Sequence, residues 1–155
     1  MSFDEAAVDT FFNNMVSRAL SLGYFDSVNS SEPKASPGTD IVCAIWIQRI
    51  RPYPAGSGLS ATTGVVTANN RIYSNMLQDP QDEIDPRIMK ATTALLKAYT
   101  GDFSFGNTAR NVDLLGASGE SLSAQAGYIN IGNQMCRVMT ITVPVIFNDM
   151  WNQVT

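Results

Sequence analysis

The segment that decides the fold is residues 71–103, RIYSNMLQDPQDEIDPRIMKATTALLKAYTGDF. Asp85 is a favourable helix N-cap, Pro86 suits the first helical turn, and Gly101 can end a helix in a left-handed conformation. These signals predict a helix from about Pro86 to Thr100. Apolar positions recur at spacings of three and four residues, as in a helix with one buried face: Ile88, Thr92, Leu95, Leu96 and Tyr99. Strand-like segments flank it, so we expect a helix laid across a sheet.

A second helix is predicted near the start of the chain. Ser2 followed by Glu5 forms a capping box, and an apolar stripe runs to Gly23. The stripe consists of Val8, Phe12, Met15, Ala19 and Leu22. We therefore expect a helix from about Phe3 to Leu22. The next segment, Tyr24 to Asp40, is rich in Ser, Pro and Gly and is predicted to be an irregular crossing.

The first long strand is predicted to be apolar on both faces. From Ile41 to Ile47 every position of both alternating sets is apolar, so the strand needs a cover on each side. The helix layer is one cover, and a neighbouring subunit is a candidate for the other. Prolines and glycines then mark a turn before Thr63 to Leu77, which indicates a long hairpin with a projecting tip.

The C-terminal part is predicted to hold three antiparallel strands. Asn107 to Leu115 and Ser121 to Ile131 flank a turn at Gly116 to Gly119, and Met135 to Asn148 alternates strictly. Pro144 lacks an N–H, which favours a sheet edge or a bulge at that point. The whole pattern predicts a single two-layer α+β domain over residues 1–155. An N-terminal helix and one long central helix pack on a mostly antiparallel sheet of about five strands.

Composition excludes several classes of protein. Net charge is −4 and the ten basic residues are scattered, which argues against a surface that grips nucleic acid. No apolar run approaches the length of a membrane span, and no leader peptide is visible. Cys43 and Cys136 both lie in apolar strand-like segments, which favours buried free thiols over a disulfide.

No catalytic, cofactor or metal site is predicted. The chain has no histidine, which removes histidine triads and most transition-metal sites. The sequence GASGES at residues 116–121 lacks the lysine of a phosphate loop, and a hairpin turn is favoured there. The acidic residues Asp79, Asp82, Glu83 and Asp85 lack EF-hand spacing. They suit the start of a helix, or else a basic patch on a neighbouring molecule.

A series of short motifs runs in order along nearly the whole chain. They are Gly23-Tyr24-Phe25, Glu32-Pro33 with Pro37, Arg71-Ile72-Tyr73, Asp79-Pro80, Ile84-Asp85, Gly101-Asp102-Phe103, Val112-Asp113-Leu114 with Gly116 and Gly119, Gly127-Tyr128 and Asn148-Asp149-Met150-Trp151. Together they resemble the tail terminator proteins of long-tailed, siphovirus-type bacteriophages, notably those of actinobacterial hosts. The resemblance implies a hexameric ring on the head-proximal end of the tail tube. Such a ring stops tube growth, docks the neck proteins of the head and lets DNA pass through its hole.

The resemblance also implies partners and a location. The expected partners are further copies of the chain, the tail tube protein, a head–tail connector or stopper protein, and DNA that passes without tight binding. The expected location is the neck region of the virion tail after assembly in the host cytoplasm, with no membrane contact, no catalytic residue and no cofactor. The expected interface residues are Trp46, Arg49, Arg51, Tyr53, Asp79, Asp82, Glu83, Phe147, Met150 and Trp151. For Trp46 and Trp151, packing within the chain is an alternative.

Three other functions remain open at the level of sequence. One is another neck component, such as a head–tail stopper. The second is a monomeric ligand-binding α+β domain, which predicts a large apolar cavity. The third is an enzyme that uses carboxylates such as Asp113 or Glu120 with a divalent ion, although no pair has a telling spacing.

Overall fold

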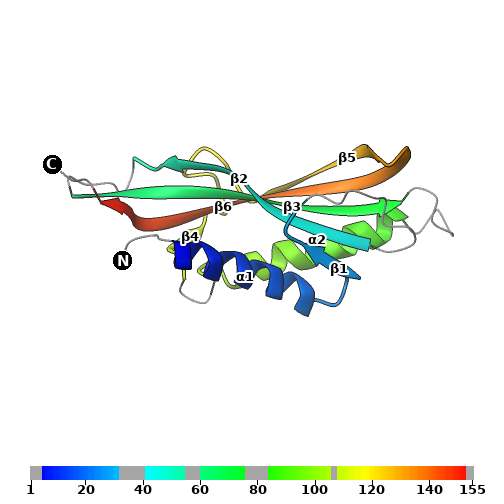
Figure 1. Ribbon diagram of the computed structural model, residues 1–155, viewed down its shortest axis with the longest axis horizontal. Helices are drawn as coiled ribbons and strands as arrows, with labels where there is room; N and C mark the ends of the chain where they lie inside the picture. The colour runs from blue at the N-terminus through cyan, green and yellow to red at the C-terminus, as the bar shows by residue number, and fades with distance from the viewer. Residues whose placement is uncertain (1–4, 32–40, 55–59, 76–83, 106–107, 153–155) are drawn as a thin grey trace.

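The three-dimensional structure, a computed structural model of the chain, describes residues 5–31, 41–54, 60–75, 84–105 and 108–152. It has the predicted α+β class, with two helices and one mostly antiparallel sheet in these residues (Figure 1). The elements in chain order are α1 (Glu5–Ser21), β1 (Ser27–Asn29), β2 (Ile41–Pro52), β3 (Ala61–Asn75), α2 (Ile84–Gly101), β4 (Asn111–Val112), β5 (Ser123–Ile131) and β6 (Gln134–Asn152).

The strands of the described residues form one six-stranded sheet. Their order is β1-β2-β3-β6-β4, and β5 also pairs with β6. Every pair is antiparallel except β1 with β2, which is parallel. β3 and β6 form the longest ladder, from Ala61 opposite Asn152 to Asn75 opposite Cys136. Along its other side, β6 pairs first with β5 and then with β4.

The main core lies between this sheet and the two helices, which cover the same face (Figure 1). Phe11 of α1 and Leu95 and Tyr99 of α2 are fully buried, as the apolar stripe of the second helix predicts. The Phe11 ring packs edge-on against Phe105 and Phe147, with centroids 5.4 and 5.2 Å away. Since burial of one such side chain contributes about 1.5–3 kcal/mol, this face supplies much of the stability.

A buried polar contact crosses the centre of this core. The Tyr99 hydroxyl donates to Oδ1 of Asn70 on β3, and the Asn70 amide nitrogen lies 3.6 Å from Sδ of Met15. Burial raises the pKa of Tyr99 well above its ordinary value, so the hydroxyl keeps its proton and remains a donor. Burial also raises the pKa of the nearby Cys43 thiol to about 12. Cys43 and Cys136 are both free and buried, which confirms the prediction of free thiols.

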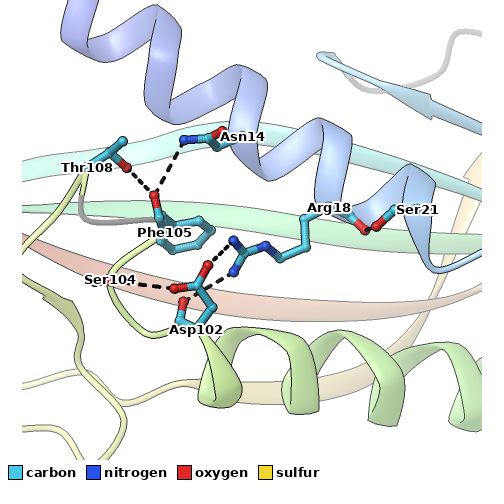
Figure 2. Close-up of polar contacts among 7 residues, drawn as sticks. All are labelled: Asn14, Arg18, Ser21, Asp102, Ser104, Phe105 and Thr108. Atoms are coloured by element: carbon cyan, nitrogen blue, oxygen red, sulfur yellow. Dashed lines mark hydrogen bonds and ion pairs between the residues drawn. The ribbon is translucent and has the colours of Figure 1, made fainter.

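The end of α2 is tied to α1 by a charged cluster (Figure 2). The Arg18 guanidinium pairs with the Asp102 carboxylate, donates to the Asp102 carbonyl at 3.2 Å, and lies 4.9 Å above the Phe105 ring. The Phe105 carbonyl accepts hydrogen bonds from Asn14 at 3.5 Å and Thr108 at 2.7 Å. Phe105 has a φ of 50°, which is unfavourable for a side chain of this size. These contacts and the burial of its ring hold it there.

The opposite face of the sheet is partly covered within the chain itself. Ala44 and Tyr73 are buried there in a second apolar cluster, together with Ile131, Cys136 and Val138 of the β5–β6 hairpin. The sequence pattern correctly indicated that β2 is apolar on both sides. A neighbouring subunit is not needed to bury Ala44, because side chains of the same chain pack against it.

The helix ends differ from the predicted ones by one or two residues. α2 begins at Ile84, so Asp85 lies in its first turn and not before it, and the expected cap is wrong. Gly101 is the last helical residue and is not left-handed; the left-handed residue is Phe105. α1 starts at Glu5, and its predicted cap, Ser2, lies outside the described residues.

The strands after α2 differ more. The predicted strand at 107–115 is reduced to β4, and β4 does not pair with β5, so Gly116 to Gly119 is not a hairpin turn. Pro144 lies neither at a bulge nor on the outer edge: it pairs with Thr67 and falls where β6 changes partner from β5 to β4. Its missing N–H is tolerated because no strand faces it there. β1, within the predicted irregular crossing, is an additional short strand.

Candidate interaction surfaces

The loop of residues 113–122 is organised around one buried carboxylate. Oδ1 of Asp113 accepts the backbone N–H groups of Gly116 and Ala117, both at 2.9 Å, and Oδ2 accepts that of Ser118 at 2.6 Å. Gly116 and Gly119 have φ values of 90° and 104°, which other residues adopt only with strain. The amides therefore form a small anion-binding cradle, and the anion it holds belongs to the chain.

The pKa of Asp113 follows from this geometry. Burial by itself would raise the pKa of the carboxyl, but hydrogen bonds from Ser118, Ala117 and Gly116 to the charged form outweigh it. The net effect is a pKa below the ordinary value. Asp113 is thus a structural anion. Its lone pairs point at backbone donors, which are also the donors that a phosphate would require.

The far side of the loop is fastened to β2. Arg51 donates from Nη2 to the Ser118 carbonyl at 2.6 Å, and Arg49 forms an ion pair with Glu120. Arg51 pairs with Val65 of β3, which packs outside the main core, so the loop crosses the sheet on the face opposite the helices. Asp113 and Glu120, weighed above as carboxylates for a divalent ion, are thus engaged by backbone amides and by Arg49. No cluster of three or more potential metal ligands occurs among the residues that the structure describes.

One end of the sheet extends past the helix layer as an arm built from β2, β3 and the last part of β6 (Figure 1). Ile50 and Trp151 are 46% and 40% exposed on this arm. A Cβ on Gly64 would lie 2.3 Å from Sδ of Met150 and 3.1 Å from the Trp151 ring, so a glycine is required at the register shift between Thr62 and Gly64 in the β3–β6 ladder. Asp149, between Asn148 and Met150, has a φ of 52° and is exposed.

A groove of about 760 Å³ lies in the helix layer, between the start of β1 and the outer side of α2. Met89 and Tyr24 line it and are 52% and 45% exposed. Lys90 and Lys97 add positive charge. The other lining residues are Leu22, Thr93, Ala94 and Ala98. This surface is apolar with two lysines, whereas the arm is apolar and carries Asp149 as well as Arg49 and Arg51.

The predicted interface residues are scattered over different environments. Trp46 is half-buried, with the Arg71 guanidinium 5.2 Å from its ring centroid. Tyr53, Phe147 and Met150 are buried at 8%, 5% and 2% exposure, so within this chain they pack in the interior. Arg49 and Arg51 fasten the 113–122 loop, and Trp151 is exposed on the arm. Asp79, Asp82 and Glu83 lie outside the described residues.

Two features of these surfaces were not predicted from the sequence. The cradle around Asp113 was missed, although an aspartate three residues before Gly116-Ala-Ser-Gly119 is a composition that favours such a turn. The groove was missed because Tyr24 and Met89 are distant in sequence, and only the tertiary structure places the segment after α1 beside α2. Among the residues that the structure describes, no helix combines the length and apolarity that crossing a membrane requires.

No protein-family model and no curated protein matches the chain. Among the solved structures, the chain is similar to the sheath/tube terminator of an extracellular contractile injection system, PVC, in its extended state. The TM-score is 0.37 with 14% identity, and the match covers 100% of this chain and 62% of that chain. The function proposed below rests on the surfaces of this chain.

Proposed function

We propose that this chain is a structural virion protein, a tail terminator of a long-tailed phage, and not an enzyme. Copies would form a hexameric ring on the head-proximal end of the tail tube. The ring would stop tube growth and bind the head–tail connector or stopper, while DNA passes through its lumen. The observation that carries the proposal is that two unlike surfaces with exposed apolar side chains, the arm and the groove, lie on different parts of one molecule. The sequence resemblance supplies the ring order and the place in the particle.

A closed ring requires a head-to-tail contact, in which one surface of each copy binds a different surface of the next. The arm offers the exposed side chains Trp151 and Ile50. Exposed tryptophan is typical of residues that anchor interfaces. The groove offers the exposed side chains of Met89 and Tyr24 as an apolar floor. We infer that the arm of one copy lies in the groove of its neighbour.

Charge supports the same pairing. The groove carries Lys90 and Lys97, and the arm carries the exposed carboxylate of Asp149. Arg49 and Arg51, which flank Ile50 on the arm, are engaged by Glu120 and by the Ser118 carbonyl of the same chain. Opposite charges at the rim of an apolar contact fix its register and oppose incorrect pairing. The net charge of −4 also suits a ring through which DNA must slide without being held.

The test is imaging of native particles by electron microscopy, together with arm and groove variants made in the phage. The wild-type protein should form one hexameric ring between tail tube and neck. Trp151→Ala and Met89→Asp should each give tails of abnormal length or tails that fail to join heads. Leu115→Ala is the matched control, because this side chain is 95% exposed but belongs to neither surface. Normal tails in both variants, or a protein absent from the particle, would refute the proposal.

The particle also separates this proposal from its nearest alternative. A ring that contacts the tail tube directly identifies a terminator. A ring that contacts only the portal and another neck protein identifies a head–tail stopper. Circular dichroism of each variant must match that of the wild type, so that abnormal tails are not caused by misfolding.

A further inference from the structure

β5 is an unprotected edge strand of the sheet. Among the residues that the structure describes it pairs with β6 alone, and it lies at the border of the molecule (Figure 1). Its sequence, SAQAGYINI, contains no charged residue and no proline. Side chains from Ser123 to Ala126 are exposed, and Tyr128 is 60% exposed. Natural sheets protect such edges with lysine, proline or bulges, because free backbone groups attract another strand.

The hairpin turn shows which backbone groups are free. Gly132 and Asn133 have φ values of 56° and 65°, and Ile131 pairs directly with Gln134 across this two-residue turn. In such hairpins the pair that flanks the turn exchanges both hydrogen bonds, and hydrogen-bonded pairs then alternate along the ladder. The odd-numbered residues of β5 therefore bond to β6. The N–H and C=O groups of the even-numbered residues 124, 126, 128 and 130 point away from the sheet.

We propose that two copies of this chain pair through β5, antiparallel and about a two-fold axis at Gly127, to form one continuous sheet. In this register Ala126 faces Tyr128 of the second copy, and Ala124 faces its Asn130. Every free donor and acceptor from 124 to 130 then meets a free partner, because even-numbered residues lie opposite even-numbered residues. A small side chain also lies opposite a larger one at each of these pairs, which suits close packing across strands.

The register is favoured for two further reasons. Gly127 at the axis has no side chain, so the two strands meet there without a clash. The strand itself has no charged residue, and the guanidinium of Arg137 on β6 is engaged within its own chain by the Tyr128 ring and the Gly127 carbonyl. Pairing with the other edge of the sheet is less favourable. That edge is formed by the three-residue strand β1 and, beyond it, by the rest of β2, which has a bulge between Ile47 and Arg49 and ends at Pro52, so the outer backbone groups do not form a continuous ladder.

This contact is independent of the proposed ring. The arm and the groove join unlike surfaces of successive copies, whereas β5 joins like surfaces of two copies. A nine-residue edge with few large apolar side chains buries little area, so we expect a weak dimer that forms at high protein concentration.

The first test is a cysteine cross-link at the axis. In Gly127→Cys the new Cβ has only an ordinary contact, 3.7 Å from Cγ2 of Val138, and the native Cys43 and Cys136 are buried. In the proposed register the two new thiols lie across a non-hydrogen-bonded pair, with Cα atoms about 4.5 Å apart, close enough for a disulfide. Mild oxidation should give a covalent dimer.

Ala124→Cys is the matched control on the same strand. In the proposed register the two thiols introduced by this substitution are separated by about six residues along the strands, roughly 20 Å, and should not cross-link. Equal dimer yields from the two variants would overturn the register. No dimer from Gly127→Cys at high protein concentration would overturn the proposal itself.

The second test places charge on the edge without altering the bonds to β6. In Ala126→Lys the two lysines would lie diagonally across the axis, about 7–8 Å apart, and repel each other. Sedimentation should show loss of the concentration-dependent dimer. Ala117→Lys adds the same charge at an exposed position of the 113–122 loop and should leave the dimer unchanged. A dimer that survives Ala126→Lys, or one that Ala117→Lys abolishes equally, would contradict pairing through β5.

Discussion

The two faces of the sheet are covered by different kinds of structure. On one face, α1 and α2 bury rings and aliphatic chains such as Phe11, Leu95 and Phe105. On the other face, the 113–122 loop is held by the Asp113 carboxylate and by Arg49 and Arg51 of β2. The first cover is apolar and helical. The second combines the small apolar cluster around Ala44 and Tyr73 with a loop that depends on hydrogen bonds and charge.

This difference predicts different responses to change. Apolar burial depends on packing and is almost insensitive to pH and salt, so damage to the helix face should cost the most. Hydrogen bonds to a carboxylate contribute less and depend on its ionisation. A partly exposed ion pair contributes least, because water and salt screen it. The following predictions test this order.

The largest effect is expected at the helix face. Phe11→Ala removes a fully buried ring that contacts Phe105 and Phe147, and should lower the free energy of unfolding by about 3–5 kcal/mol. Phe12→Ala, one residue along the same helix, is the control because Phe12 is only half-buried. Denaturant titration should show a clearly smaller loss for it. Equal losses would mean that the helix face is not packed as described.

The second effect concerns the loop cover. Asp113→Ala leaves the N–H groups of Gly116, Ala117 and Ser118 without their acceptor, and should cost about 1–3 kcal/mol. Asp113→Asn keeps one acceptor oxygen and should cost less. Hydrogen exchange at these three amides should accelerate in the alanine variant while exchange in α2 stays slow. Acceleration throughout the protein instead would contradict a local role.

The third effect is the pH dependence of the same contact. The folded-state pKa of Asp113 lies below its ordinary value, so its contribution is complete above the unfolded pKa and disappears as pH falls through the folded pKa. Stability of the wild type should therefore decrease below about pH 4. Unfolding titrations across this range should show a shallower decrease for Asp113→Asn. Identical slopes for the two proteins would show that other carboxyl groups account for the acid sensitivity.

The smallest effect is expected at the ion pair. The side chains of Arg49 and Glu120 are 50% and 27% exposed, so Glu120→Gln should cost at most about 1 kcal/mol. Raising the salt concentration should reduce the difference between variant and wild type, because mobile ions screen exposed charges. Thermal unfolding at low and high salt measures this. If Glu120→Gln lowers the free energy of unfolding as much as Asp113→Ala does, the ion pair with Arg49 is the main contact that holds the loop.

The sequence was informative wherever local chemistry and periodicity act alone. The apolar stripe of α2 and the alternation of Met139 to Phe147 in β6 both proved to be the buried faces. The length of the β2–β3 hairpin and the free thiols also followed from pattern and composition. The Gly132–Asn133 dipeptide between two strand-like segments is also a recognisable hairpin signal. The doubly apolar character of β2 was predicted, but not what packs against its second face.

Other features were decided by tertiary structure. β4 and β5 both pair with β6 because a 19-residue strand offers room for two partners, which no local pattern encodes. Asp113 could be recognised in the sequence as a carboxylate, but only the folded loop directs three backbone amides at it. The left-handed residue after α2 is Phe105 and not Gly101, because burial of the phenyl ring against Phe11 and Tyr99 outweighs the backbone preference that favours glycine.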